Sequence, residues 1–251
     1  MTTPDTTEDA RRVSRNLDAV VVRLSDSVTI IRGDCRDVLP VECDAVVTDP
    51  PYGINWRPRV NHQNDGWTDN EAFDPAPCLA VGRLHLFWGA NYYADKLPPS
   101  QSWFVWVKRP AGFDFSADPR TYATVELAWS DFGTKAKHKE LCWDGGKRAG
   151  DSDNRTFCHP SQKPIELMQW CLPADAETIC DPYMGSGTTG IACIRMGRRF
   201  VGIERDPAHF ATARQRLENE LRQGLLPLTH NIPAETRASR SLQPIVGKGE
   251  T

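Results

Sequence analysis

The stretch that decides the fold is ETICDPYMGSGTTGIACIRMGRRFVGIERD, residues 177–206. An apolar run ends at Asp181, a glycine-rich turn follows, and an apolar helical segment leads to a second strand-like run that ends at Glu204. This strand–turn–helix–strand order is the unit from which parallel sheets are built. Asp206 can cap the helix that follows, with Pro207 at its first position. The stretch therefore predicts an α/β fold.

Five other apolar runs predict further strands of the same sheet. They lie at residues 27–34, 43–52, 83–90, 102–109 and 121–130. Most are short and continuous, which is typical of parallel strands that are covered on both faces. Residues 164–172 open with Pro164 and continue apolar, so they predict a helix. Together with the two strands of the first stretch, these runs predict a doubly wound, mostly parallel, seven-stranded Rossmann-like sheet.

Composition indicates a single globular domain. The chain has 251 residues, 39% of them hydrophobic, which is enough to bury a sizeable core. We expect a domain over 19–223, with a flexible arm over 1–18 and a flexible tail over 224–251, because both ends are polar and aperiodic. No stretch resembles an export signal or a membrane span, so we expect a cytoplasmic protein without membrane contact. The 8 cysteines include no C-x-x-C pair, and no metal site is predicted.

The first motif with chemical meaning is GSGTTG at 185–190. A G-x-G-x-x-G between a strand and a helix permits a tight turn and lets a ligand approach the helix N-terminus. Glu204, at the end of the next strand, can accept hydrogen bonds from ribose hydroxyls. This pattern fits a nicotinamide dinucleotide and fits S-adenosylmethionine equally well.

Two residues outside the glycines favour S-adenosylmethionine. Asp181 precedes the turn, where its carboxylate would repel a pyrophosphate and could hold a cationic amino-acid group. Lys163, in HPSQKP at 159–164, could pair with an amino-acid carboxylate. A nicotinamide-dependent oxidoreductase is therefore the weaker interpretation of the turn.

The second motif is TDPPYG, residues 48–53, which ends a strand because neither Pro50 nor Pro51 has an N–H for the ladder. The proline carbonyls and the Asp49 carboxylate remain as acceptors, and Tyr52 adds a flat stacking surface. Such a group suits a planar ring that carries an exocyclic amine. Hydrogen bonds to both amine N–H groups favour a pyramidal nitrogen whose lone pair faces an electrophile such as a sulfonium methyl.

Two long polar segments, 53–75 and 133–158, are candidates for contact with DNA. A base inside a duplex must be flipped out before its amine can enter such a pocket. Residues 133–163 carry seven Lys/Arg against four Asp/Glu, or +3 locally in a chain of net charge −3, which favours phosphate contact. Aromatic side chains that could stack or wedge between bases are Trp56, Trp67 and Trp143.

Taken in order, the motifs resemble those of the DNA amino-methyltransferases that act on adenine N6 or cytosine N4. The set comprises GDC (33–35), TDPPYG (48–53), HPSQKP (159–164), DPYMGSGTTG (181–190) and VGIE (201–204). The catalytic motif precedes the cofactor motif, as in the circularly permuted β group of that family. The resemblance covers most of residues 27–222 and implies a mostly parallel sheet with one antiparallel strand.

The resemblance also implies roles for individual residues. The catalytic tip would comprise Asp49, Pro50, Pro51 and Tyr52. The cofactor set would comprise Asp34 near the adenine, Lys163 near the methionine part, and Asp181, Gly185, Ser186, Gly187, Thr188 and Glu204. A side chain added at Gly187 would then block the cofactor. DPPY usually accompanies adenine in this group, so the expected reaction is methylation of adenine N6 in double-stranded DNA by a monomer or homodimer, with cytosine N4 as the alternative.

Other functions fit the residues less well. Cytosine C5 methylation needs a Cys nucleophile, and Pro77-Cys78 lies in APCLAVG, which predicts the start of a helix. A non-catalytic DNA-binding protein would not use a cofactor turn, and an oxidoreductase leaves DPPY without a role. An RNA or protein substrate stays open, as does the part played in restriction–modification, phage protection or regulation.

Overall fold

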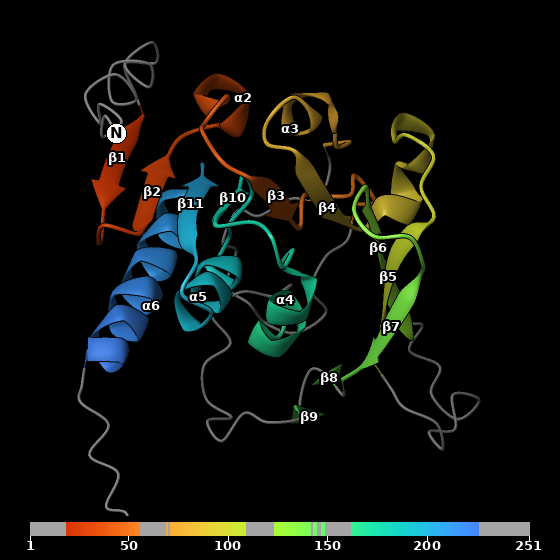
Figure 1. Ribbon diagram of the computed structural model, residues 1–251. Coiled ribbons are helices and arrows are strands. Elements are labelled where there is room, and N and C mark those ends of the chain that lie inside the picture. The colour runs from red at the N-terminus through yellow and green to blue at the C-terminus, as the bar shows by residue number, and fades with distance from the viewer. Residues whose placement is uncertain are drawn as a thin grey trace, which may run out of the picture.

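A nine-stranded sheet runs through the described part of this computed structural model, which comprises residues 19–55, 69, 71–108, 123–141, 143–144, 147–148 and 162–225. The strand order is β1-β2-β11-β10-β3-β4-β6-β5-β7 (Figure 1). The strands are β1 (Val20–Arg23), β2 (Val28–Arg32), β3 (Ala45–Thr48), β4 (Leu84–Trp88), β5 (Ser102–Val107), β6 (Val125–Ser130), β7 (Lys137–Glu140), β10 (Thr178–Asp181) and β11 (Arg199–Glu204). Separately, β8 (Trp143–Asp144) pairs with β9 (Lys147–Arg148).

The sheet confirms the doubly wound, mostly parallel prediction but corrects its strand count. The seven predicted strands are present, and the two additional ones, β1 and β7, lie at the edges. Both β1 and β6 run antiparallel to the other strands, where the resemblance implied one such strand. An edge strand needs no apolar run, and β7 reads KHKE inside the stretch that we expected to be a loop. β1 is also short and mostly exposed.

Helices cover both faces of the sheet, as Figure 1 shows. One face packs against α4 (Ile165–Cys171), α5 (Thr188–Arg195) and α6 (Pro207–Leu225). The other face packs against α2 (Cys35–Val38), α3 (Ala76–Leu79) and the 3₁₀ turn η1 (Ala90–Tyr92), with η2 (Ala94–Lys96) beyond it. Alternate residues serve the two cores: Ala45 and Val47 of β3 face the first layer, and Val46 faces the second. This double burial explains why the central strands read as continuous apolar runs.

The topology brings the predicted motifs to one edge of the sheet. β2, β11, β10, β3 and β4 are parallel, so their carboxyl ends lie together. The connection after β10 leads in one direction, through α5 to β11, and the connection after β3 leads in the other, through α3 to β4. Ligands of open α/β sheets bind at such a switch point, outside the carboxyl ends of the strands. The residues after β3 and after β10 are therefore neighbours across this crevice.

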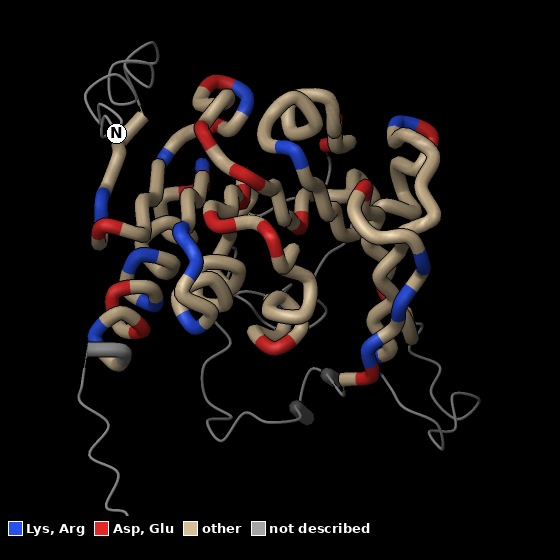
Figure 2. The backbone as a smooth tube through the Cα atoms, viewed as in Figure 1, with Lys and Arg blue, Asp and Glu red and all other residues tan. Residues whose placement is uncertain are grey.

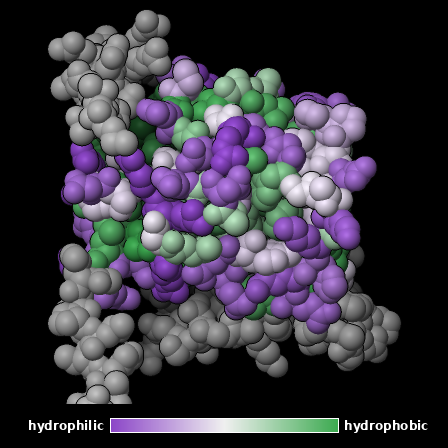
Figure 3. Space-filling model, in the orientation of Figure 1, coloured by the Kyte–Doolittle hydropathy of each residue, from purple (hydrophilic) through white to green (hydrophobic). Residues whose placement is uncertain are grey.

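The predicted arm (1–18) lies outside the described residues, as does the predicted tail apart from its first residues, 224–225, which end α6. Among the residues that the structure describes, no helix is long and apolar enough to cross a membrane. Most of the face drawn in Figure 3 is hydrophilic, and its hydrophobic residues gather in small areas.

Candidate active site

A cavity of about 980 Å³ opens at the carboxyl edge of the sheet. Its walls come from the ends of β2, β3, β4, β5, β10 and β11 and from the start of β6, which runs in the opposite direction. Eight of the residues singled out from the sequence line it: Asp34, Asp49, Pro50, Pro51, Tyr52, Lys163, Gly185 and Glu204. The predicted catalytic tip and part of the predicted cofactor turn thus share one space.

The tip of β3 presents Asp49 toward this cavity. The Tyr52 hydroxyl donates to Asp49 Oδ1 at 2.5 Å, which holds the carboxylate and the aromatic ring together. β3 ends at Thr48, directly before Asp49 and the two prolines. The predicted acceptors and stacking surface are therefore adjacent in space as well as in sequence.

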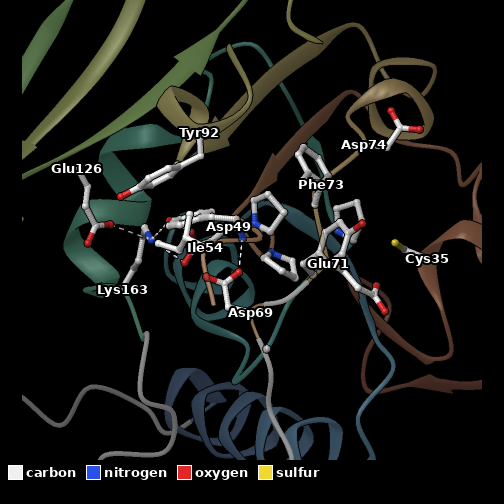
Figure 4. A pocket seen from close by; sticks show the side chains of 18 of the residues that line it. Cys35, Asp49, Ile54, Asp69, Glu71, Phe73, Asp74, Tyr92, Glu126 and Lys163 are labelled. Carbon is white, nitrogen blue, oxygen red and sulfur yellow. Dashed lines mark hydrogen bonds and ion pairs between the residues drawn. The ribbon is translucent and has the colours of Figure 1, made fainter. Parts of the chain in front are cut away.

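Lys163 lies buried between two carboxylates. Its ammonium nitrogen is 2.6 Å from Asp49 Oδ2 and 3.1 Å from Glu126 Oε2, as the dashed lines in Figure 4 mark. It also donates to the Tyr52 hydroxyl at 3.3 Å. A second lysine, Lys108, pairs with the other oxygen of Glu126. In this structure Lys163 is thus paired with groups of the predicted catalytic tip, whereas the resemblance implied a place near the methionine part of the cofactor.

The ionisation of this cluster follows from its burial and its neighbours. Burial raises the pKa of Asp49 above its ordinary value, and Lys163 opposes that rise while Glu126 adds to it. Burial would also raise the pKa of Glu126, but Lys163 and Lys108 together hold it below its ordinary value. Burial acts against the Lys163 ammonium, yet its two carboxylate partners leave its pKa raised. Two carboxylates and two ammonium groups balance each other here.

Asp69 anchors the tip from below and was missed by sequence reasoning. Its Oδ1 accepts the backbone N–H of Tyr52 at 2.6 Å and that of Gly53 at 2.8 Å. The residue is 3% exposed. Its carboxylate satisfies the two N–H groups that the chain reversal after the prolines leaves unpaired. Nothing in the aperiodic stretch 53–75 distinguished this Asp from its polar neighbours.

The opposite end of the cavity is built around Glu204. Its Oε2 accepts the Gly185 N–H at 3.0 Å, and its Oε1 accepts the Asp206 N–H at 2.7 Å. These bonds tie the end of β11 to the glycine turn after β10. Burial raises the pKa of Glu204 above its ordinary value, while the two N–H donors oppose the rise. Beside it, Asp34 pairs with Arg36, which holds the pKa of Asp34 below its usual range.

Asp181, which we expected to hold a cationic amino-acid group, is engaged by donors of the protein itself in this arrangement. It is 2% exposed, and it accepts the Thr48 hydroxyl at 2.7 Å and the Thr189 hydroxyl at 2.5 Å. The Tyr183 N–H donates to it as well. Burial raises the pKa of Asp181 to about 6, and these donors oppose the rise. Its oxygens hold β3, β10 and α5 together.

The rest of the glycine turn also faces away from the large cavity. Ser186 and Thr188 are buried and contact the guanidinium of Arg216. With Asp181 they line a separate small cavity of about 60 Å³, which also touches Asp49, Lys163 and Gly185. Gly187 lines neither cavity: its φ is +82°, and a Cβ there would meet Ala213 of α6 at 3.2 Å. This geometry gives no support to the expectation that a side chain at Gly187 would block the cofactor, which stays a prediction.

Comparison with known proteins identifies the family. The model of the N6/N4 DNA methylase family, described as DNA methylase, matches residues 88–215, about half of the chain. The chain belongs to this DNA methylase family.

Individual DNA methylases resemble parts of the chain. The type II methyltransferase M2.DpnII of Streptococcus pneumoniae is 45% identical over 165 residues, which are 55% of this chain and 59% of that protein. M2.LlaDCHI of Lactococcus lactis subsp. cremoris is 37% identical over 168 residues, 57% of this chain and 61% of that protein. The chain thus spans about three fifths of the length of these curated relatives. The crystal structure of the M1.HpyAVI–SAM complex is 24% identical and covers 76% of this chain and 100% of that one, with a TM-score of 0.48.

The matched segment of the DNA methylase model contains Glu126, Lys163, the glycine turn and Glu204, but it begins after Tyr52. The assignment of the catalytic tip therefore depends on the geometry of the cavity. Glu126 could have been noticed as a lone acid in the apolar run VELAWS, because a charge in a buried strand needs a partner.

A cysteine mechanism finds no support in this DNA methylase. Cys78 is 1% exposed in α3, and burial raises the pKa of its thiol far above the ordinary value. A reactive cysteine needs an accessible thiolate, so Cys78 is a packing residue. The side chains of Trp56, Trp67 and Trp143, which we considered for base contacts, lie outside the described part of the chain.

Proposed function

We propose that this chain transfers the methyl group of S-adenosylmethionine to the N6 amine of an adenine that has been flipped out of double-stranded DNA. One observation carries the proposal: the Asp49–Tyr52 tip lines the same 980 Å³ cavity as Gly185 and Glu204. A methyl acceptor and a methyl donor bound at these two ends would share one enclosed space, which is what direct transfer requires.

The cofactor end offers groups that suit S-adenosylmethionine. Each Glu204 oxygen accepts one backbone N–H and keeps a lone pair for a ribose hydroxyl. Asp34, on the neighbouring β2 end, would face the adenine. Gln162 lines both cavities, and its buried Oε1 has no hydrogen-bond partner among the described residues, which suits the ammonium group of the methionine part. The cofactor would supply an electrophilic sulfonium methyl.

The catalytic tip would hold and activate the target amine. Asp49 and the Pro50 carbonyl would accept its two N–H groups, and the Tyr52 ring would fix the plane of the base. An aromatic amine is a poor nucleophile because its lone pair is delocalised, and these two bonds localise the pair toward the methyl group. Lys163 would act on Asp49 as a counter-ion that keeps the buried carboxylate charged, with Glu126 and Lys108 balancing Lys163.

DNA is the proposed substrate because of the family and the type II methyltransferase relatives. Lys137 and Lys139 lie on β7, and Lys135 lies just before it. Figure 2 shows blue positions along this edge strand. Positive charge at a sheet edge suits phosphate contact. Segments 53–75 and 133–158 stay candidates for gripping the duplex. Cytosine N4 is the alternative target, because the same family model covers both bases.

The test is transfer of labelled methyl from S-adenosylmethionine to unmethylated duplex DNA, followed by nucleoside analysis. Label in N6-methyladenine would support the proposal, and sequencing of the product would map the site. Label in N4-methylcytosine would keep the mechanism and overturn the choice of base. Label on added RNA or protein, with none on DNA, would contradict the proposed substrate.

A further inference from the structure

Four charged side chains form a continuous row at the cofactor end of the cavity. The Arg36 guanidinium donates to both oxygens of Asp34, at 2.9 and 2.5 Å. Glu71 Oε2 lies 3.8 Å from Arg36 Nη1 and accepts from Arg205 Nη1 at 3.2 Å. The row is therefore Asp34, Arg36, Glu71 and Arg205, with charges of alternating sign, and all four residues line the cavity.

This row joins three segments that surround the predicted cofactor site. Arg36 lies in α2, which begins directly after Asp34. Glu71 comes from the segment that follows the catalytic tip, and Arg205 directly follows Glu204 at the end of β11. Glu71 thus bridges the surroundings of Asp34 and of Glu204, the two residues that we propose as contacts of the adenosine part.

The Glu71 bridge lies at the rim of the cavity, on a backbone that is fixed on both sides. The side chains of Arg36, Glu71 and Arg205 are 60%, 54% and 48% exposed. By contrast, Asp69 and Phe73, which come from the same segment in Figure 4, are each 3% exposed. Breaking the bridge therefore requires only the rotation of exposed side chains.

Exposed ion pairs are weak, which suits a bridge that opens and closes. Two such pairs together favour the closed arrangement by about three- to tenfold. A ligand that passes only through the open arrangement enters and leaves in proportion to the fraction of molecules that are open. The bridge would therefore slow both rates by the same factor and leave the affinity nearly unchanged.

We propose that Glu71, through its bridge to Arg205 and Arg36, gates the passage of S-adenosylmethionine and of its product S-adenosylhomocysteine. The inference rests on the proposed function, since it needs the cofactor at the Glu204 end of the cavity. Duplex DNA would approach the opposite end, where the catalytic tip lies. An exit beside Glu71 would thus let the spent cofactor leave while DNA is still bound.

The test measures association and dissociation of the two compounds on the immobilised whole chain, for the wild type and Glu71→Gln. Both compounds should bind and leave the variant about three- to tenfold faster, with Kd within about twofold of the wild-type value. S-adenosylhomocysteine lacks the sulfonium charge, so a long-range charge effect of Glu71 would alter only the binding of S-adenosylmethionine. The control is Glu218→Gln, which removes an exposed Glu–Arg pair on α6 and should change neither rate.

Two further measurements assign the effect to the bridge. Arg205→Gln should also speed both rates, and combining it with Glu71→Gln should give less than the product of the two separate effects, because the residues share one contact. Raising the salt to about 1 M should bring the wild-type rates toward those of Glu71→Gln, because salt screens exposed pairs. A residue that only supports the fold would show neither behaviour.

Four results would overturn the proposal. Faster dissociation with unchanged association would mean that Glu71 is an ordinary binding contact. A change for S-adenosylmethionine alone would mean a long-range charge effect, and unchanged rates for both compounds would mean that the bridge does not control passage. A wild type that binds neither compound would overturn this proposal together with the cofactor assignment. Because the test needs no DNA, an absence of methyl transfer would count against the proposed function alone.

Discussion

The ammonium nitrogen of Lys163 lies 2.6 Å from the carboxylate of Asp49, in a part of the site where Lys163 is buried and Asp49 is half-buried. Glu126 holds the same ammonium group at 3.1 Å and is itself paired with Lys108. The charge state of the catalytic tip is therefore set by four groups from four different segments. Substitution of Lys163 or of Glu126 therefore tests how each one affects the pKa of Asp49.

Opposite shifts of the pH–rate profile should follow from changes at Lys163 and Glu126. If the rate needs ionised Asp49, whose pKa is raised by burial, it should fall as the pH drops through that raised pKa. Lys163→Met removes the cation that lowers this pKa, so the acid limb should move to higher pH. Glu126→Gln removes a charge that raises it, so the limb should move to lower pH. Single-turnover rates between about pH 4 and 8 would measure both.

A matched control is Glu166→Gln, which removes an exposed ion pair with Lys139 and should leave the acid limb in place. Shifts in the same direction for Lys163→Met and Glu126→Gln would disprove the counter-ion account.

Removal of the Asp69 carboxylate should loosen the catalytic tip. Asp69→Ala leaves the N–H groups of Tyr52 and Gly53 without their acceptor, and each charged hydrogen bond contributes about 1.5–3 kcal/mol. We expect the single-turnover rate to fall by about tenfold to a hundredfold. Asp69→Asn keeps one acceptor oxygen and should lose less. The idea fails if Asp69→Ala methylates at the wild-type rate.

A methyl group at Gly89 should displace Tyr52. Gly89→Ala puts Cβ within 2.4 Å of three ring atoms, so the ring must leave its place and transfer should be lost, while cofactor affinity stays near the wild-type value. Gly197→Ala is the control, because Gly197 also has a positive φ, +66°, but a Cβ there meets nothing within 4 Å. Normal methylation by Gly89→Ala would show that the ring does not rest on Gly89 in the working enzyme.

Gly187 should matter for stability more than for the cofactor. Gly187→Ala forces a side chain into left-handed backbone geometry, which costs about 1–3 kcal/mol, and crowds Ala213. Urea unfolding should show the loss, while the cofactor affinity of the folded enzyme stays within about twofold, because Gly187 lines neither cavity. If Gly187→Ala loses cofactor affinity without losing stability, Gly187 belongs to the cofactor site after all.

Sequence reasoning succeeded where burial leaves a pattern. Central strands covered on both faces must be apolar, so β3 and β10 were visible in the sequence. The motif at 48–53 was predicted as an acceptor tip because two prolines end a ladder. Edge strand β7 was not predicted, because an exposed edge strand does not need an apolar run.

Individual side chains at the site were harder to predict than the elements that carry them. Sequence order places Asp181 before the turn, but whether its carboxylate points outward or into the protein depends on Thr48 and Thr189, which come from separate elements. Lys163 and Glu126 likewise meet only through the fold, because Lys163 lies just before α4 and Glu126 lies in β6. Tertiary pairing of charges has no local signature, so Asp69 and Glu126 required the structure.

The most direct test of the account is methyl transfer by the wild type and Asp49→Ala side by side, with cofactor affinity measured on the same samples. The account predicts that Asp49→Ala binds S-adenosylmethionine within about threefold of the wild type and loses transfer to DNA by about a thousandfold, since its loss removes an acceptor that acts in the transition state. Transfer by Asp49→Ala at a rate near that of the wild type would contradict the assignment of the Asp49–Tyr52 tip as the catalytic centre.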